Sequence, residues 1–120
     1  MGDSDHHLKI AREKHAGANQ EFSSGRHSNV ADLALKAVEQ AIEAEAAREG
    51  LHFHIRPRTA HSKRRDWLKS RHPALSIHFE ALWIAYGDLG YDGIDGKRAK
   101  EALAAMEAIF DGLGANQERD

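Results

Sequence analysis

The chain of 120 residues contains no cysteine and only two prolines. Without cysteine it has no disulfides, no thiolate metal sites and no cysteine nucleophile. Its longest uncharged apolar runs are far shorter than the roughly 18 residues that a membrane-spanning helix needs. No apolar run follows the opening "MGDSDHHLKI", as a signal peptide would require. These absences predict a cytoplasmic protein without a membrane segment.

The bulk composition predicts one globular domain. A chain of this length can bury a real core, and 41% of its residues are hydrophobic. Its mean hydropathy is −0.65. We therefore expect residues 1–120 to form a single domain, with flexible tails at 1–5 and 114–120.

Apolar residues spaced by three and four positions predict four long helices, over about 6–22, 29–48, 73–89 and 97–113. The second is the clearest, because Ser28 or Asn29 is placed to cap its start, with Asp32 three residues after Asn29, and Gly50 follows its end. Four amphipathic helices of this length predict an all-α fold. We expect an antiparallel, up-and-down four-helix bundle.

The connection between the second and third long helices is unusual, because it takes about 22 residues where 2–8 are common. Residues 51–55, "LHFHI", alternate apolar and polar side chains, which predicts an extended piece lying on the bundle. Pro57 forbids a helix through it, and Ser62 is placed to cap a short helix that contains Trp67. This long connection is also the most basic part of the chain.

Charge is distributed very unevenly. Seven Lys or Arg and a single Asp lie within residues 52–72, so this segment carries +6 while the whole chain carries −2 and the remainder −8. Such asymmetry says little about the fold, but it bears directly on possible partners.

The third long helix carries two apolar stripes. One contains Phe79 and Leu82, and the second, on roughly the opposite side, contains Ile77, Ala81 and Ile84. A helix that is apolar nearly all round is either central or shared with another protein surface. We therefore predict a homodimer formed through this helix.

Three stretches resemble the HEPN family of small helical bundles. They are "ADLALKAVEQAIEAEAAREG", the His-Ser of "TAHSK", and "LWIAYGDLGYDGIDGKRAKEALAAMEAIF", and together they span about 28–113. The resemblance implies a dimer, and a companion of minimal nucleotidyltransferases that acts in toxin–antitoxin pairs or in nucleotide binding. Some members are metal-independent ribonucleases with an Arg-x(4–6)-His motif near the start of the final helix. Here that helix begins "GKRAKEAL" and has no histidine, so the expected catalytic position is vacant.

The same spacing occurs elsewhere, and it provides an enzyme hypothesis. Two such pairs, Arg56 with His61 and Arg65 with His72, lie wholly within the basic connection. A metal-independent ribonuclease needs a histidine to move the 2′-hydroxyl proton and an arginine to stabilise the phosphorane charge. Four such pairs occur in the chain against roughly two expected by chance, so the spacing alone is a weak motif.

A binding role is the main functional hypothesis. Arg58, Arg64, Lys69 and Arg71 are candidates to contact phosphates, and Trp67 is a candidate to stack on a base. The ligand would be RNA or a nucleotide, with no cofactor. The structural alternative is that the acidic second helix, with Glu39, Glu43, Glu45 and Glu49, neutralises the connection within the protein or across a dimer. A purely structural protein-interaction domain is the third possibility.

A metal site receives less support from the sequence. His52 and His54 project to one side of an extended chain, and His61 is near in sequence. However, Asp66 is the only acid within 52–72, and the net positive charge of the segment repels a cation. We therefore predict no metal site here.

Overall fold

The computed structural model describes residues 2–92 and 96–117. It contains five α-helices, which are α1 (Gly2–Ser23), α2 (His27–Ala47), α3 (Pro57–Arg71), α4 (Ser76–Asp92) and α5 (Gly96–Leu113). Two short 3₁₀ turns, η1 (Phe53–Ile55) and η2 (Pro73–Leu75), flank α3. No strand occurs within the described residues, which confirms the all-α prediction. Over this part of the chain, no helix is both long and apolar enough to cross a membrane.

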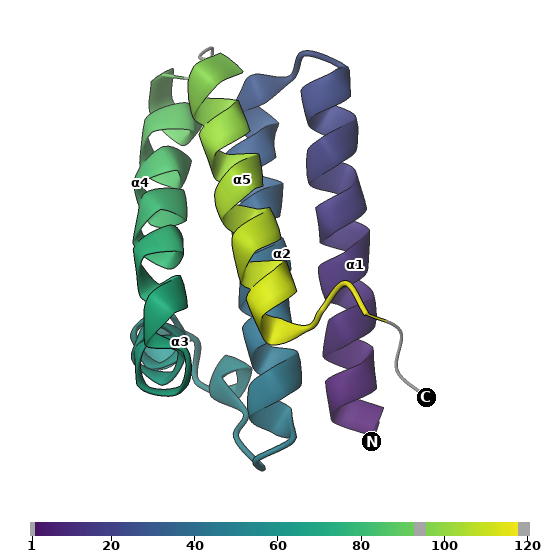
Figure 1. The fold of residues 1–120 in the computed structure, drawn as a ribbon, viewed down its shortest axis with the longest axis vertical. Helices are drawn as coiled ribbons and strands as arrows, with labels where there is room; N and C mark the ends of the chain where they lie inside the picture. The colour runs from purple at the N-terminus through teal and green to yellow at the C-terminus, as the bar shows by residue number, and fades with distance from the viewer. Residues whose placement is uncertain (1, 93–95, 118–120) are drawn as a thin grey trace.

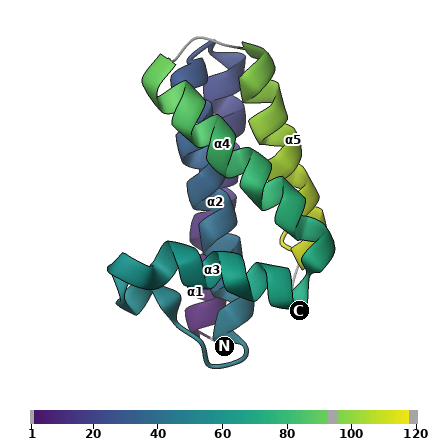
Figure 2. The ribbon, with the colours of Figure 1, turned by 90° about the vertical axis from the view of Figure 1, so that its left-hand side faces the viewer.

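α1 and α2 lie side by side along the long axis of the molecule, α5 is slightly tilted from it, α4 runs obliquely across α2, and α3 crosses one end (Figures 1 and 2). A tight turn at residues 24–26 joins α1 to α2, so these two helices run in opposite directions, and α4 and α5 do the same. α2 packs against α1, α4 and α5. The end of α2, the whole of α3 and the start of α1 therefore meet at one end of the molecule.

Small side chains on α2 allow this central position. Val30, Ala34, Ala37, Val38 and Ala41 are buried, as the apolar spacing predicts. Alanine lets neighbouring helices approach closely and has the highest helix propensity. Gly50 ends the helix region with a φ of 78°, a conformation that glycine adopts at no steric cost.

The long connection is more helical than predicted. α3 begins at Pro57 and covers 15 residues, whereas only a short helix starting near Ser62 was expected. Proline is favoured in the first turn of a helix, because the missing N–H has no partner there, and the Lys and Arg residues that follow are good helix formers. Residues 53–55 form a 3₁₀ turn rather than an extended piece. This turn packs Phe53 against the core.

Ordered contacts reach into both of the predicted tails. α1 starts at Gly2, and the buried Ser4 hydroxyl donates to the carbonyl of Ala44, 2.7 Å away. At the other end, Arg12 donates from Nε to the carbonyl of Ala115, at 3.1 Å. Residue 1 and residues 118–120 of these tails lie outside the described residues.

α4 presents one buried and one exposed apolar side. Phe79, Leu82 and Ala85 are buried against the other helices. On the opposite side, Ile77 is 71% exposed and Ile84 is 56% exposed. The second stripe predicted from the sequence is therefore left uncovered within one chain.

Candidate functional site

The inner side of α3 is bound to the acidic side of α2. Arg64, whose side chain is only 12% exposed, donates from Nε to Glu43 Oε2 at 2.7 Å and from Nη1 to Glu39 Oε2 at 3.0 Å. Glu43 is fully buried. Burial raises the pKa of Glu43, but hydrogen bonds from Arg64 and His54 and the charge of Arg64 outweigh it, so the net pKa lies below its ordinary value.

Glu49, just after α2, holds the other end of α3. Trp67 Nε1 donates to Glu49 Oε2 at 2.9 Å, and the Arg71 guanidinium donates to Oε1 from Nε at 3.0 Å and from Nη2 at 2.8 Å. Hydrogen bonds from Arg71 and then Trp67 lower the pKa of Glu49. The Trp67 ring is buried, so little of it is accessible to a base.

Three of the five residues predicted to bind a ligand therefore pair with carboxylates of the protein itself, although the Arg71 side chain remains 47% exposed. Arg64, Trp67 and Arg71 all have carboxylate partners from the acidic set that the structural alternative named. The other two, Arg58 and Lys69, are exposed.

The outer side of α3 has a different character. The exposed cations on α3 and just before it, which we call the basic surface, are Arg56, Arg58, Lys63, Arg65 and Lys69. Within the described part of the chain, no hydrogen bond or ion pair engages the side chain of any of them except Arg65, which lies 3.6 Å from the exposed Asp66. The basic surface is thus charged and almost unpaired.

Two adjoining cavities open beside the start of α3. One, of about 350 Å³, is lined by residues 50–53 together with Ile55, Arg56 and Lys63. The other, of about 360 Å³, is lined by residues 56–59 and Lys63. Arg56 and Lys63 belong to both, so cations and apolar side chains meet at one place.

The predicted catalytic residues are spread along α3. His61 and His72 are eleven residues apart, roughly 16 Å along a helix, so they do not form one site. His61 and Arg65 are instead neighbours at i and i+4 on the same helix. Arg56 precedes the first turn, and His72 follows the last, where its ring lies 5.8 Å from that of Trp67.

His61 lies in a stack of aromatic rings between α3 and α4. Its ring centroid is 3.8 Å from that of Trp83, and Trp83 is 5.4 Å from Tyr86. Trp83 remains 39% exposed. The His61 Nδ1 atom is buried without a hydrogen-bond partner among the described residues, and Glu39 Oε2 lies 3.9 Å away.

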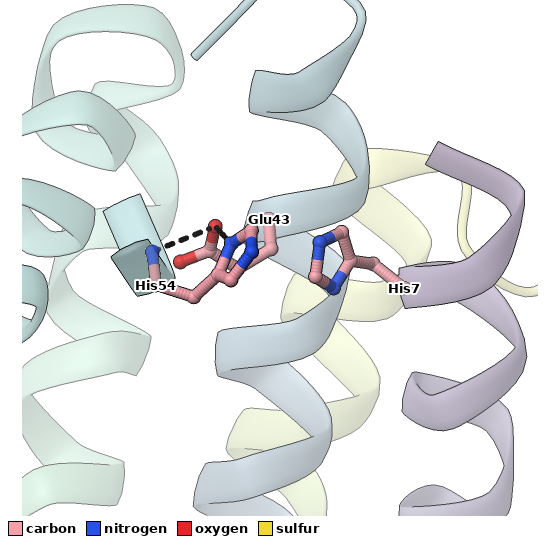
Figure 3. A group of neighbouring side chains, drawn as sticks. All are labelled: His7, Glu43 and His54. Carbon is pink, nitrogen blue, oxygen red and sulfur yellow. Dashed lines mark hydrogen bonds and ion pairs between the residues drawn. The ribbon is translucent and has the colours of Figure 1, made fainter. Parts of the chain in front are cut away.

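His7, Glu43 and His54 form a second group of neighbouring side chains (Figure 3). The sequence did not predict this group. Its possible ligand atoms lie within 4.8 Å of one another. His7 was missed because only His52, His54 and His61 were considered as metal ligands; in the structure it is buried in α1. The burial of His7 could have been predicted from the apolar stripe of α1 through Leu8 and Ala11, because Ser4 and His7 each lie four residues before a member of that stripe.

The carboxylate of this group, that of Glu43, was also missed, because only acids within residues 52–72 were considered as metal ligands. Glu43 comes from α2, and η1 brings His54 to it: the His54 backbone N–H and Nδ1 lie 3.3 Å and 3.1 Å from Glu43 Oε1. Of the predicted histidines, His54 joins the group, while His61 lies elsewhere in the stack with Trp83.

No protein-family model matches the chain, and no curated protein or solved structure shows significant similarity to it.

Proposed function

We propose that the protein is a HEPN-like four-helix bundle module that binds RNA or a nucleotide through the basic surface of α3. The observation that carries the proposal is the set of exposed cations around the start of that helix, of which Arg56, Arg58 and Lys63 have no side-chain partner among the described residues. Acidic residues of α2 pair with Arg64, and Glu49, just after α2, pairs with Arg71, which leaves the outer cations available to phosphates.

The two cavities suit the chemistry of a nucleotide. Their size lies near the lower end of the range of about 300–1,000 Å³ that is common for ligand sites. Leu51, Phe53 and Ile55 offer apolar surface to a base or sugar, and Arg56 and Lys63 stand beside them to bind phosphate oxygens. A base and its phosphate therefore have complementary surfaces next to each other.

The rest of the basic surface extends this site along the helix. At about 100° per residue, Arg58, Arg65 and Lys69 fall on one side of α3, next to the side that bears His61. A single strand of RNA placed along this side would meet three cations in succession, with the exposed part of Trp83 nearby for stacking.

The test measures binding of a fluorescently labelled single-stranded RNA, and separately of labelled ATP, at several salt concentrations in EDTA. Each phosphate contact adds about 0.7 to the slope of log affinity against log salt for a single strand. A triple variant, Arg58→Ala with Arg65→Ala and Lys69→Ala, should bind RNA at least about tenfold more weakly and reduce that slope by about 2.

A charge-matched control separates this surface from the general charge of the protein. The triple variant Lys9→Ala, Lys36→Ala and Lys100→Ala removes three exposed cations from α1, α2 and α5. It should bind RNA nearly as well as the unaltered protein does. Equal losses in the two triple variants, or an affinity that does not change with salt, would refute the proposal. Binding of ATP without RNA binding would identify a nucleotide site.

A ribonuclease is the second candidate, and one observation favours it. His61 has a buried ring nitrogen without a hydrogen-bond partner among the described residues, and Arg65 is its neighbour one turn along α3. Incubation with RNA in EDTA tests it: cleavage that is lost in His61→Ala and kept in His72→Ala would assign the reaction to this pair. Cleavage that survives His61→Ala would exclude the pair.

The proposal includes a homodimer formed through α4. It is supported by the exposed stripe of Ile77, Ala81 and Ile84, because a contiguous apolar patch on a protein surface often marks an interface. A nucleotidyltransferase partner is supported by the resemblance to HEPN domains.

A further inference from the structure

Three parts of the chain bring two imidazoles and one carboxylate together. His7 comes from α1, Glu43 from α2 and His54 from η1, and Figure 3 shows the His7 ring directed toward the other two. Zinc–nitrogen and zinc–oxygen bonds are about 2.0–2.2 Å long, so two ligands of one ion lie at most about 4 Å apart. The possible ligand atoms are all within 4.8 Å of one another. Side-chain shifts of about 1 Å would therefore suffice to enclose an ion.

The geometry points to a binding site for a divalent first-row transition-metal ion, Zn²⁺ or a similar ion, held by His7, Glu43 and His54. Two histidines and one glutamate form a ligand set found in zinc enzymes and, in a facial arrangement, in iron enzymes. Such a set leaves at least one coordination position for water or another ligand.

A hydrogen bond to Gln40 orients the His7 ring for metal binding. The Nδ1 atom of His7 lies 2.8 Å from Gln40 Oε1, and because an amide oxygen only accepts, Nδ1 carries the proton. The lone pair of His7 is then on Nε2. A hydrogen bond that fixes the second ring nitrogen is the usual support of a metal-binding histidine.

The local charge also favours a cation. Arg64 occupies Glu43 Oε2 and leaves Oε1 facing His54. Because Arg64 is shared with Glu39, two carboxylates surround one guanidinium, and the group has a net charge of −1 when the histidines are neutral. Arg58, Arg65 and Lys69 of the basic surface lie about 100–140° around α3 from Arg64, whereas Arg56 and Lys63 line a cavity together with His52, the neighbour of His54.

An ion has a route to this site. The His54 side chain is 42% exposed although Glu43 is fully buried. His52 lies beside His54 with a centroid separation of 6.1 Å, and His6 lies beside His7 at 5.6 Å. These neighbours offer imidazoles for capture of an ion at the surface. A bound ion would tie the start of α1 to η1 across α2.

The test uses the full chain without a histidine tag, stripped with EDTA and then freed of chelator. Isothermal titration calorimetry with Zn²⁺ should give one ion per chain, and Co²⁺ should develop visible d–d absorption. His54→Gln and His7→Gln should each weaken Zn²⁺ binding by at least about tenfold. Zn²⁺ should raise the thermal midpoint of the unaltered protein and not that of His54→Gln.

His27→Gln is the matched control. His27 lies on the same helix as Glu43 but 16 residues earlier, about 24 Å along the axis, so its replacement should leave Zn²⁺ affinity unchanged. Circular dichroism checks that each variant is folded, and the partly exposed His54 is the variant expected to fold normally. Absence of saturable Zn²⁺ uptake, or equal affinity in His54→Gln and the unaltered protein, would overturn the assignment.

Discussion

The direction in which each cation of α3 points decides whether it stabilises the fold or is free to bind. Ala60, Arg64, Trp67 and Leu68 follow the spacing of one helix face, and this face meets α2. A count of the charges over residues 52–72 could not separate Arg64 from Arg58 or Lys69, because it takes no account of the side of the helix on which each residue lies. Once the helix is known to begin at Pro57, the phase distinguishes inner from outer cations.

Glu49 leads to a prediction about pH. Its pKa is lowered from an ordinary value of 4.5 by the hydrogen bonds from Arg71 and Trp67. A lowered pKa in the folded state means that the ionised form stabilises the fold above about pH 4.5, and that this contribution is lost as the pH falls through the lowered value. In Glu49→Gln, urea unfolding should therefore show lower stability than the unaltered protein at pH 7, and the difference should shrink steadily below pH 4.5.

Arg71→Ala provides the matched comparison, because it removes the main cause of the shift while keeping the carboxylate. Relative to the unaltered protein, Arg71→Ala should also be less stable to urea at pH 7, and this difference should likewise shrink below pH 4.5. A difference between Glu49→Gln and the unaltered protein that stays constant from pH 7 to pH 3 would contradict this account of the Glu49 contacts.

At the scale of helices, the apolar pattern was sufficient to locate a helix where that helix has a hydrophobic stripe. The final helix was predicted over about 97–113 and runs over Gly96–Leu113, and the second ends at Ala47, just before the predicted signal at Gly50; its start at His27, however, lies before the predicted cap at Asn29. The first turn of α1 and most of α3 consist of polar residues. Their positions depend on tertiary hydrogen bonds and ion pairs to α2, which local periodicity does not reveal.

The first turns of α1 provide a prediction at this scale. Ser4 and His7 are buried, and they bind the Ala44 carbonyl and the Gln40 side chain of α2. Hydrogen bonds of this kind contribute about 0.5–1.5 kcal/mol each. The double variant Ser4→Ala/His7→Ala should therefore lower the free energy of urea unfolding, measured in EDTA, by about 2 kcal/mol.

Lys9→Ala/Glu13→Ala alters two exposed side chains of the same helix and serves as the control. Surface changes of this type usually alter stability by less than about 0.5 kcal/mol. If the two double variants unfold at the same urea concentration, the start of α1 behaves as the flexible tail that the sequence suggested.

For the whole molecule, the division of charge between α2 and α3 explains how an acidic protein displays a basic surface. α2 is covered on most sides, and its carboxylates near the crossing helix are used by Arg64 and by His54. The surplus of cations then lies on the outside of α3. The sequence predicted that this segment carries the function, but the histidine–glutamate group joins residues 7, 43 and 54, and only the folded chain brings them together.

The exposed stripe of α4 leads to the last prediction, which concerns assembly. Ile77, Ala81 and Ile84 lie on one side of the helix and are exposed in a single chain. Full burial of an isoleucine contributes about 1.5–3 kcal/mol, and a twofold interface buries each position twice. We expect the protein to sediment at twice the 13.3 kDa mass of the chain.

The variant Ile77→Lys/Ile84→Lys should raise the dimer dissociation constant by at least about a hundredfold. Ala16→Lys/Ala104→Lys places the same charges on exposed positions of α1 and α5 and should leave the dimer intact. A monomer at every concentration of the unaltered protein would remove α4 as an interface, and the stripe would then be an apolar surface open to other partners.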